Sequence, residues 1–195
     1  MDCNDEQLME AHLQGDDAAF GVLINRYANA LFGYLLRLTG HSQDAEDLLQ
    51  ETLLRIHTKA HTFKTDKRFK PWAFAIATNI ANDRFRSIKR RGVVLTMDDP
   101  DRPIPETAFQ DCEDTADINP VKNVIRTELQ ERVQDAIKTL PERQRTALVL
   151  AYYQDLSYRE VAEVMKCSVG TVKTHMSRAL HKLADILPAP GSESV

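Results

Sequence analysis

The chain has 195 residues, of which 43% are hydrophobic and 28% are charged, and its formal net charge is −4. This composition is typical of a globular protein, and the length allows one medium domain or two small ones. Because no apolar run approaches the ~20 residues of a membrane span and the acidic start is unlike a secretory signal, we expect a cytoplasmic protein without membrane insertion.

Both halves of the chain are predicted to be helical, with an acidic segment between them. Residues 1–92 carry a net charge of +1 and residues 121–195 one of +2, whereas residues 93–120 hold eight acidic residues and one basic residue. This middle segment has four prolines and few large apolar residues, so it cannot bury enough surface to offset its ordering entropy. We therefore predict an all-α protein with two small helical domains, 1–92 and 121–187, a flexible acidic linker, 93–120, and a tail, 188–195.

The N-terminal domain is predicted to have a short first helix and three longer ones. Gly15 ends the first helix, and Asp16 is placed to cap the second, which Gly40 ends. Ser42 is predicted to cap the third helix, which runs to Ala60. Apolar residues at steps of three and four predict the inward faces of the second and third helices: Phe20, Leu23, Tyr27, Leu31, Tyr34 and Leu38, then Ala45, Leu48, Leu49, Thr52, Leu53 and Ile56.

A loop over 61–70 leads to the last helix of this domain. Pro71 suits the first position of a helix because its missing N–H would have no partner there. We expect the helix to run from Trp72 to about Arg90.

The window from Lys64 to Arg91 combines basic and aromatic residues. It holds nine lysines and arginines against two aspartates. A basic surface with exposed rings suits melted nucleic acid, because phosphates meet cations and unpaired bases stack on the rings. The aromatic residues in or beside the window are Phe63, Phe69, Trp72, Phe74 and Phe85. The alternative is that they belong to the core, which we favour for Phe74 and Phe85 but not for Trp72.

The C-terminal domain is predicted to have four helices. The first runs from Val124 to Thr139, and Pro141 opens the second, from Glu142 to Tyr153. Ser157 and Glu160 have the spacing of a capping box at the start of a short helix that ends at Met165. The last helix follows a turn over 166–168, is capped by Ser168 and runs to about Ile186.

The last two helices, joined by a three-residue turn, have the pattern of a helix-turn-helix. The inward face of the last helix is predicted to contain Val169, Val172, Met176, Leu180 and Leu183. Its outward face presents side chains that bind phosphates and base edges: Thr171, Lys173, Thr174, Ser177 and Arg178. The alternative is a plain helical hairpin with a solvated face. Cap, turn length, apolar spacing and basic face together favour binding in a DNA major groove.

Four carboxylates crowd the predicted third helix between Asp44 and Glu51. Acidic residues are favoured at a helix N-terminus by the helix dipole, which is one explanation. The other is a docking face for a basic partner helix.

Metal and catalytic motifs are missing from the sequence. Cys3, Cys112 and Cys167 are far apart, and His57 and His61 lack a third ligand nearby. No hydrolase, kinase, dinucleotide or metalloprotease motif is present. We expect no metal, no cofactor, no small-molecule substrate and no enzymatic activity.

Three segments, in this order, resemble the extracytoplasmic-function sigma factors of bacterial RNA polymerase. DAEDLLQETLLRIH resembles the family's helix that grips the polymerase clamp, and PWAFAIATNIANDRFRSIKRR its promoter-melting and −10 recognition helix. LPERQRTALVLAYYQDLSYREVAEVMKCSVGTVKTHMSRALHKL resembles its −35-reading domain. The resemblance spans both domains and implies two helical domains that direct core RNA polymerase to promoter DNA, with an anti-sigma protein as a regulator.

The resemblance also implies roles for residues. Those expected at the −35 element are Ser168, Thr171, Lys173, Thr174, Ser177 and Arg178. Those expected at the −10 element are Phe63, Lys64, Trp72, Asn79, Asn82, Arg84 and Arg86, with Phe63, Lys64 and Asn79 around a flipped-out base. Those expected to bind core polymerase are Asp47, Gln50, Glu51 and Leu54.

Two other functions remain open at this point. An autonomous helix-turn-helix regulator would need a sensing pocket or a phospho-acceptor site in its N-terminal half, and neither is evident. An enzyme with a DNA-binding appendage would need a catalytic constellation. A sigma factor is distinguished from both by tight binding to core polymerase and weak binding to duplex DNA alone.

Overall fold

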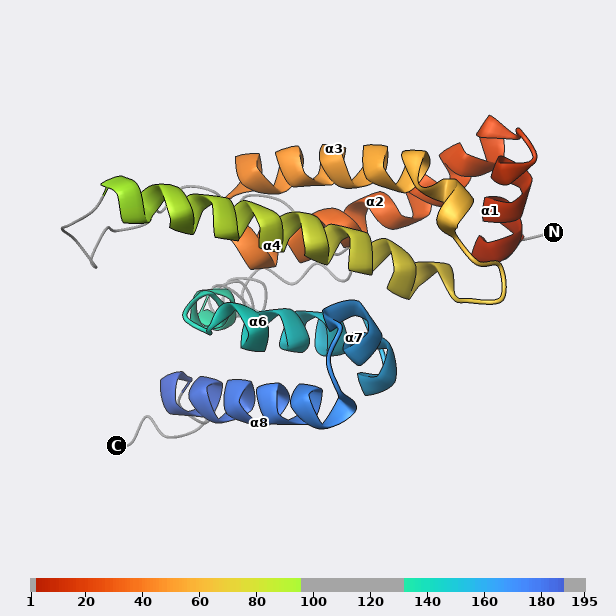
Figure 1. The fold of residues 1–195 in the computed structure, drawn as a ribbon. Coiled ribbons are helices and arrows are strands. Elements are labelled where there is room, and N and C mark those ends of the chain that lie inside the picture. Colours follow the sequence, from red (N-terminus) through yellow and green to blue (C-terminus); the bar gives the residue numbers. More distant parts are fainter. Residues whose placement is uncertain (1–2, 96–131, 188–195) are drawn as a thin grey trace, which may run out of the picture. The chain divides into compact units, whose positions relative to one another are not determined.

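The structure, a computed structural model, describes residues 3–95 and 132–187 (Figure 1). These residues belong to two compact units, one N-terminal and one C-terminal. Every regular element in the described ranges is helical, which confirms the all-α prediction for them. The predicted acidic linker and the tail lie outside the described residues. None of the described helices has the length and hydropathy needed to span a membrane.

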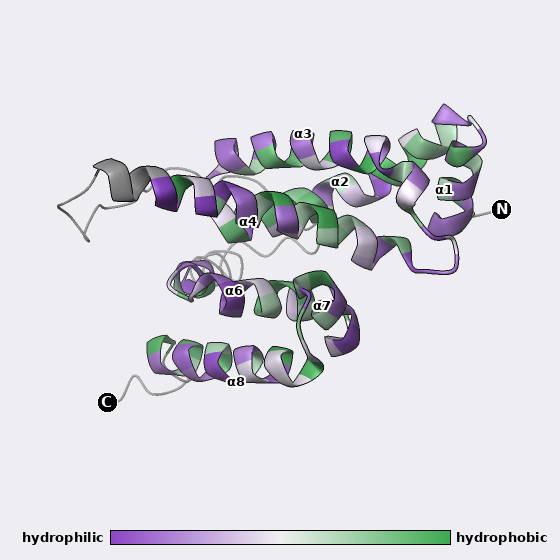
Figure 2. Cartoon of the chain, in the orientation of Figure 1, coloured by the Kyte–Doolittle hydropathy of each residue, from purple (hydrophilic) through white to green (hydrophobic). Residues whose placement is uncertain are grey.

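The N-terminal unit contains four α-helices and one 3₁₀ turn. They are α1 (Asp5–Leu13), α2 (Asp17–Thr39), α3 (Ser42–Thr58), η1 (Ala60–Thr62) and α4 (Phe69–Leu95). Helices α2, α3 and α4 pack along one another, and α1 lies across their end (Figure 1). Polar and apolar residues alternate around these helices, as expected for helices with one buried face (Figure 2).

The ends of α2 follow the sequence prediction. The Asp16 carboxylate accepts hydrogen bonds from the N–H groups of Ala18 and Ala19, at 3.0 and 3.1 Å. Gly40 ends the helix with φ at +77°, a left-handed conformation that glycine adopts without strain. Both predicted signals are confirmed.

The start of α3 differs from the prediction. Ser42 is the first helical residue, not the cap, and the cap position belongs to His41, which makes no side-chain cap bond. The Ser42 hydroxyl donates instead to the Glu46 carboxylate, at 3.0 Å. The helix also ends two residues early, at Thr58, because Ala60 begins the 3₁₀ turn.

Helix α4 begins at Phe69, so Pro71 is its third residue rather than its first. The prediction was wrong by two residues, but its physical reason holds: the first four N–H groups of a helix have no partner within that helix. Proline is therefore tolerated throughout this first turn.

The predicted inward faces of α2 and α3 form the core of this unit. Leu23, Leu31 and Tyr34 are fully buried, and so is Ile56. Phe20, Leu49 and Leu53 were expected to be inside but are only half-buried. The helical periodicity therefore located the core correctly and overestimated its width.

The C-terminal unit is built from short helices. A helix over 132–138 is followed by α6 (Glu142–Leu148), which continues as a π-helical turn, η2 (Val149–Tyr153). Helices α7 (Tyr158–Met165) and α8 (Val169–Ile186) complete the unit, and α8 packs beside α6. These bounds confirm the predicted helices from residue 132 onward. The predicted start at Val124 lies outside the described residues.

Two cations tie the end of the 132–138 helix to the rest of the unit. The half-buried Arg145 guanidinium donates to the carbonyls of Lys138 and Leu140, at 2.6 and 3.1 Å. Lys182 of α8 donates to the Thr139 carbonyl, at 2.7 Å. These bonds satisfy carbonyls that a helix end leaves without partners. Burial lowers the pKa of Arg145 from its ordinary value.

Candidate nucleic-acid interface

The helix-turn-helix is formed by α7, a tight turn and α8. The predicted capping box is present: Ser157 N–H donates to the Glu160 carboxylate at 2.8 Å, and Glu160 N–H donates to the Ser157 hydroxyl at 3.3 Å. Lys166 reverses the chain in the left-handed region, with φ at +52°. Ser168 then caps α8 by accepting the Thr171 N–H, at 3.1 Å. The sequence prediction of both caps is confirmed.

The buried face of α8 differs in part from the prediction. Val172 and Met176 are buried as expected, and Leu183 is half-buried. Val169 and Leu180 were predicted to face inward, but 38% and 52% of their surface is exposed. Ala179, which was not predicted to face inward, is fully buried.

The reason is the choice between two helical steps. From Met176, both i+3 and i+4 lie on roughly the same face, and α8 turns the i+3 residue, Ala179, toward the unit's interior. A small alanine at the contact lets a neighbouring helix approach closely. Leu180 instead lines a surface groove of about 360 Å³, together with Tyr158 and Lys173.

Four of the residues expected at the −35 element share the exposed side of α8. They are Lys173, Thr174, Ser177 and Arg178. The hydroxyls of Ser168 and Thr171 lie 2.9 Å apart, so these two residues first serve the helix cap. The Thr174 hydroxyl donates to the Gly170 carbonyl, at 3.0 Å. Lys173 and Arg178 are thus the long donors that this face presents.

A second helix adds positive charge to this face. Burial, then the guanidiniums of Arg143 on α6 and Arg178 on α8, lower the pKa of His175. The imidazole therefore resists protonation, first because it is half-buried and then because two positive charges act on it.

The aromatic residues of the 61–74 region form a packed cluster. Phe63 lies edge-on to Phe69 and Trp72, with ring centroids 5.9 and 5.2 Å apart, and Tyr27 contacts Phe69 at 5.1 Å. Phe63, Phe69 and Phe74 are buried, so the prediction of exposed rings is wrong for Phe63 and Phe69, whereas the core position favoured for Phe74 is confirmed. The lysines and arginines around these rings in the sequence predicted a solvent-exposed surface, but the buried rings face the unit's core. Trp72 and Phe85 are half-buried.

Polar residues expected at the −10 element lie on the loop and along α4. Lys64 and Asn79 are exposed, and Asn82 is half-buried. Arg84 pairs with Asp44 of α3 at 3.2 Å, and Arg86 lies 3.5 Å from Asp83. The structure brings Phe63 and Trp72 into contact, and it places Asn79 about two helical turns beyond Trp72 on the same helix.

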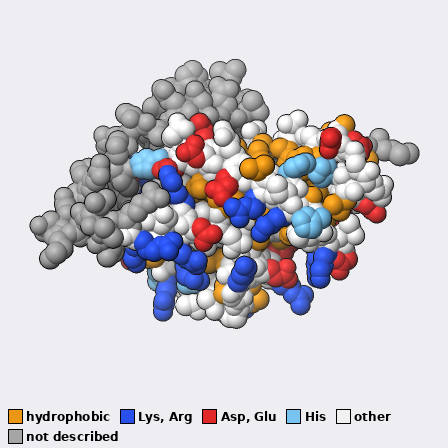
Figure 3. All heavy atoms as spheres, turned by 45° about the horizontal axis from the view of Figure 1, so that its top comes forward, with side chains coloured by type: hydrophobic (Ala, Val, Ile, Leu, Met, Phe, Trp, Pro, Cys, Tyr) orange, Lys and Arg blue, Asp and Glu red, His pale blue; other side chains and the backbone are white. Residues whose placement is uncertain are grey.

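The residues expected to bind core polymerase share one side of α3. Asp47, Gln50, Glu51 and Leu54 are all exposed, and Leu54 shows 64% of its surface. This confirms the predicted exposure of the first three. This side of α3 therefore presents two carboxylates, one amide and one apolar side chain to solvent. Figure 3 shows acidic and basic side chains interspersed over the visible face, so charge alone does not distinguish the expected polymerase-binding side of α3.

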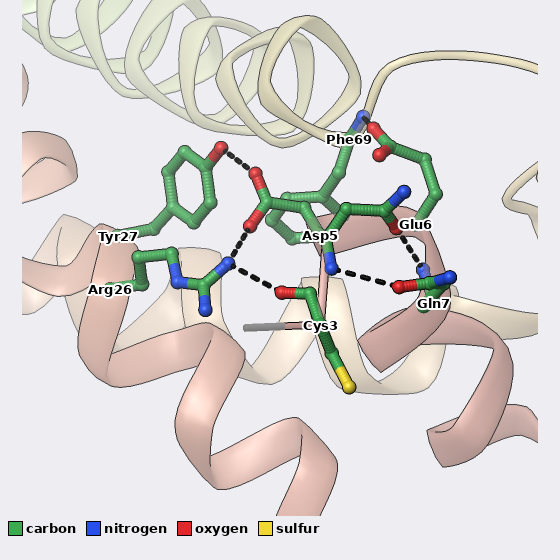
Figure 4. A network of polar contacts seen from close by, with 8 residues as sticks. Cys3, Asp5, Glu6, Gln7, Arg26, Tyr27 and Phe69 are labelled. Atoms are coloured by element: carbon green, nitrogen blue, oxygen red, sulfur yellow. Dashed lines mark hydrogen bonds and ion pairs between the residues drawn. The ribbon is translucent and has the colours of Figure 1, made fainter. Parts of the chain in front are cut away.

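The sequence analysis missed a polar network at the start of the chain (Figure 4). Asp5 of α1 binds Arg26 of α2 at 2.6 Å and accepts a hydrogen bond from the Tyr27 hydroxyl. Glu6 accepts the N–H of Phe69, at 2.9 Å. These partners are more than twenty residues apart in the sequence, so no local sequence motif predicts their contacts. Burial and the bond to Asp5 raise the pKa of Tyr27.

Metal ligands are not clustered in the part of the chain that the structure describes. No group of three or more histidine, cysteine, aspartate or glutamate side chains there has the geometry for a metal ion.

Comparisons with known proteins agree with this architecture. Sigma-70 region 2 matches residues 23–91, and Sigma-70 region 4 matches residues 130–183. The RNA polymerase sigma-H factor of Pseudomonas aeruginosa is 33% identical over 177 residues, which cover 90% of this chain and 89% of that protein. The ECF RNA polymerase sigma-E factor of Haemophilus influenzae is 32% identical, with 90% of each chain covered.

A solved structure shows the same fold. The sigma factor RpoE of Bartonella quintana, in complex with the anti-sigma factor NepR, superposes with a TM-score of 0.65 at 24% identity, over 86% of this chain and 95% of that one. The chain belongs to the extracytoplasmic-function family of RNA polymerase sigma factors.

Proposed function

We propose that this sigma factor binds core RNA polymerase and directs it to promoters by reading a −35 element with α8 and a −10 element with the N-terminal unit. The observation that carries the proposal is the geometry of α8. Its N-terminus is capped by Ser168, one side is buried through Val172 and Met176, and Lys173, Ser177 and Arg178 project from the opposite side. A helix presented in this way fits a major groove.

Recognition of −35 DNA combines two kinds of contact. Arg178 is the residue we assign to a base edge, because a guanidinium can donate two hydrogen bonds to one guanine. Lys173 and Arg143 are suited to phosphates, which position the helix without reading sequence. Thr171 supports the helix cap close to the DNA backbone.

Recognition of the −10 element is assigned to the loop after η1 and the polar face of α4. Lys64 and Asn79 are exposed there and can meet an unpaired strand. Phe63 is buried, so we expect its ring to support the base-binding site from the core side rather than to contact the base. Trp72 is the half-exposed ring that remains accessible for stacking on a base.

The acidic side of α3 is assigned to core polymerase. Asp47 and Glu51 provide charge for a basic partner, and Leu54 provides the apolar anchor of such an interface. Catalysis of transcription belongs to the polymerase, and the sigma factor works beside it in the cytoplasm. The related structure with a bound anti-sigma factor makes an anti-sigma protein the regulator we propose here.

Transcription in vitro tests the proposal. Purified chain is added to core polymerase on the DNA upstream of its own gene, a frequent target in this family, and transcripts are measured. We expect transcription only when both proteins are present, and tight binding to core polymerase without strong binding to duplex DNA alone. Tight binding to an operator without polymerase, with no transcript in its presence, would identify an autonomous regulator instead.

A further inference from the structure

We propose that Glu6 of α1 is a positioning residue for promoter opening, because it holds the start of α4 and thereby the loop that precedes it. This inference rests on the proposed function of that loop at the −10 element. It assigns a role in recognition to the N-terminal helix, which lies ahead of the segment matched to Sigma-70 region 2.

The first step concerns the unfilled cap of α4. Phe69 is the first residue of α4, and its N–H has no acceptor within the helix. The preceding residue, Arg68, has only donor groups on its side chain and cannot act as an N-cap. Glu6 supplies the missing acceptor from α1, at 2.9 Å from the Phe69 nitrogen (Figure 4). A carboxylate at this position also interacts favourably with the helix dipole.

The second step is that α1 itself is fixed. Its first turn is closed by a capping box between Asn4 and Gln7, with hydrogen bonds of 2.7 and 3.0 Å. Asp5 binds both Arg26 and Tyr27 of α2. Glu6 is therefore presented from a rigid element, which is what a positioning group requires.

The third step connects Phe69 to the loop. The Phe69 ring is fully buried between Tyr27, Phe63 and Trp72, with ring centroids 5.1, 5.9 and 5.7 Å away. Phe63 begins the loop and Phe69 ends it, so the two buried rings anchor both ends. Exposed Lys64, between them, is held toward solvent. Loss of the Glu6 bond would release one anchor.

The test uses full-length protein in holoenzyme with core polymerase. Binding is measured to a forked promoter whose −10 strand is unpaired, and strand opening on duplex promoter is followed with permanganate. We expect Glu6→Ala to lower both about fivefold, the size of a typical helix-cap effect. Glu6→Gln, which retains an acceptor oxygen, should restore most of the loss. Glu10→Ala is the matched control, because Glu10 is an exposed carboxylate on the same helix.

A double-variant comparison separates positioning from general stability. If Glu6 acts through the loop, Glu6→Ala should have little further effect when Lys64 is already alanine, because residues that act together are not additive. Core binding and −35 binding should stay at wild-type strength. Equal loss in both backgrounds, or a Glu6→Ala protein indistinguishable from Glu10→Ala on forked DNA, overturns the inference. Failure of the wild-type chain to support transcription would instead overturn the proposed function.

Discussion

The hydroxyl of Tyr34 on α2 lies 2.6 Å from the hydroxyl of Thr78 on α4, with both side chains buried. Thr78 also donates to the Phe74 carbonyl, at 2.7 Å. In this arrangement Thr78 is the donor to the carbonyl and the acceptor from Tyr34. The two helices are thus joined by a polar contact inside an apolar core.

Removal of the Thr78 hydroxyl should therefore cost more stability than removal of the Tyr34 hydroxyl. Thr78→Val leaves the Tyr34 hydroxyl buried without a partner, which costs about 1–3 kcal/mol. Tyr34→Phe leaves Thr78 bonded to the Phe74 carbonyl, so we expect a smaller loss, about 0.5–1.5 kcal/mol. Urea unfolding of the two variants gives the comparison. A larger loss in Tyr34→Phe than in Thr78→Val would contradict this hydrogen-bond assignment.

Alkaline pH should unfold the N-terminal unit in part through Tyr34. Burial raises the pKa of this phenol above its ordinary value near 10, and the bond to Thr78 opposes the rise only in part. A raised pKa in the folded state means that this contribution to stability is complete below pH 10 and is lost as the pH rises further. Tyr34→Phe should therefore flatten the fall of unfolding free energy as the pH rises above about 10. Part of the fall should remain, since burial also raises the pKa of Tyr27. An unchanged slope in the variant would rule out this role for Tyr34.

Charge reversal on α3 should weaken binding to core polymerase. Asp47→Lys with Glu51→Lys places like charges against a basic partner, and we expect at least about a tenfold loss of affinity. Glu51 also pairs with Arg55 at 2.8 Å, an exposed i,i+4 pair whose loss changes stability little. Glu10→Lys on α1 is the matched reversal outside the proposed surface. Affinity for core that equals this control, with circular dichroism unchanged, would remove α3 from the interface.

Sequence preference at the −35 element should depend on Arg178. A bidentate contact between arginine and guanine is worth about 1–3 kcal/mol of discrimination, so Arg178→Ala should relax preference at one or two base pairs. Thr171→Ala, which removes a hydroxyl that contacts Ser168, should lower binding evenly across sequences. Transcription from a panel of single-base −35 variants is the measurement. If Arg178→Ala lowers every promoter by the same factor, Arg178 binds a phosphate.

The two faces of α8 can be tested by stability alone. Ala179 is fully buried, so Ala179→Leu should overpack its contact and cost about 1–3 kcal/mol. Leu180 is half exposed, so Leu180→Ala should change the unfolding free energy by less than about 1 kcal/mol. Thermal unfolding separates the two. A larger loss of stability in Leu180→Ala than in Ala179→Leu would instead support the inward position that helical periodicity predicted for Leu180.

Sequence patterns predicted the local features of this fold well. Asp16, Gly40, Ser157 and Ser168 mark helix ends because their effects depend on neighbours within a few residues. The exposed side of α3 was predicted from the spacing of its apolar residues at steps of three and four. These features require no knowledge of distant segments.

The features that were missed depend on tertiary contacts. The buried state of Phe63 is set by Phe69 and Trp72 together, although its neighbours in the sequence are basic and polar. The cap that Glu6 provides for Phe69 joins residues 63 positions apart. Ala179 has too small a side chain to stand out in an apolar pattern. None of these contacts leaves a local signature.

The contacts of Arg145 and Lys182 affect how strongly DNA binding by the C-terminal unit depends on salt. Both cations bind carbonyls at the end of the 132–138 helix, so their charged groups are already engaged within the protein. Each phosphate neutralised on a duplex releases counterions and steepens the salt dependence of binding by about 0.9 in the logarithmic slope. The basic residues of this unit therefore overstate the number of ions it can displace. Its isolated affinity for duplex DNA should be modest and only weakly sensitive to salt, which leaves the polymerase to supply the remaining attraction to the promoter.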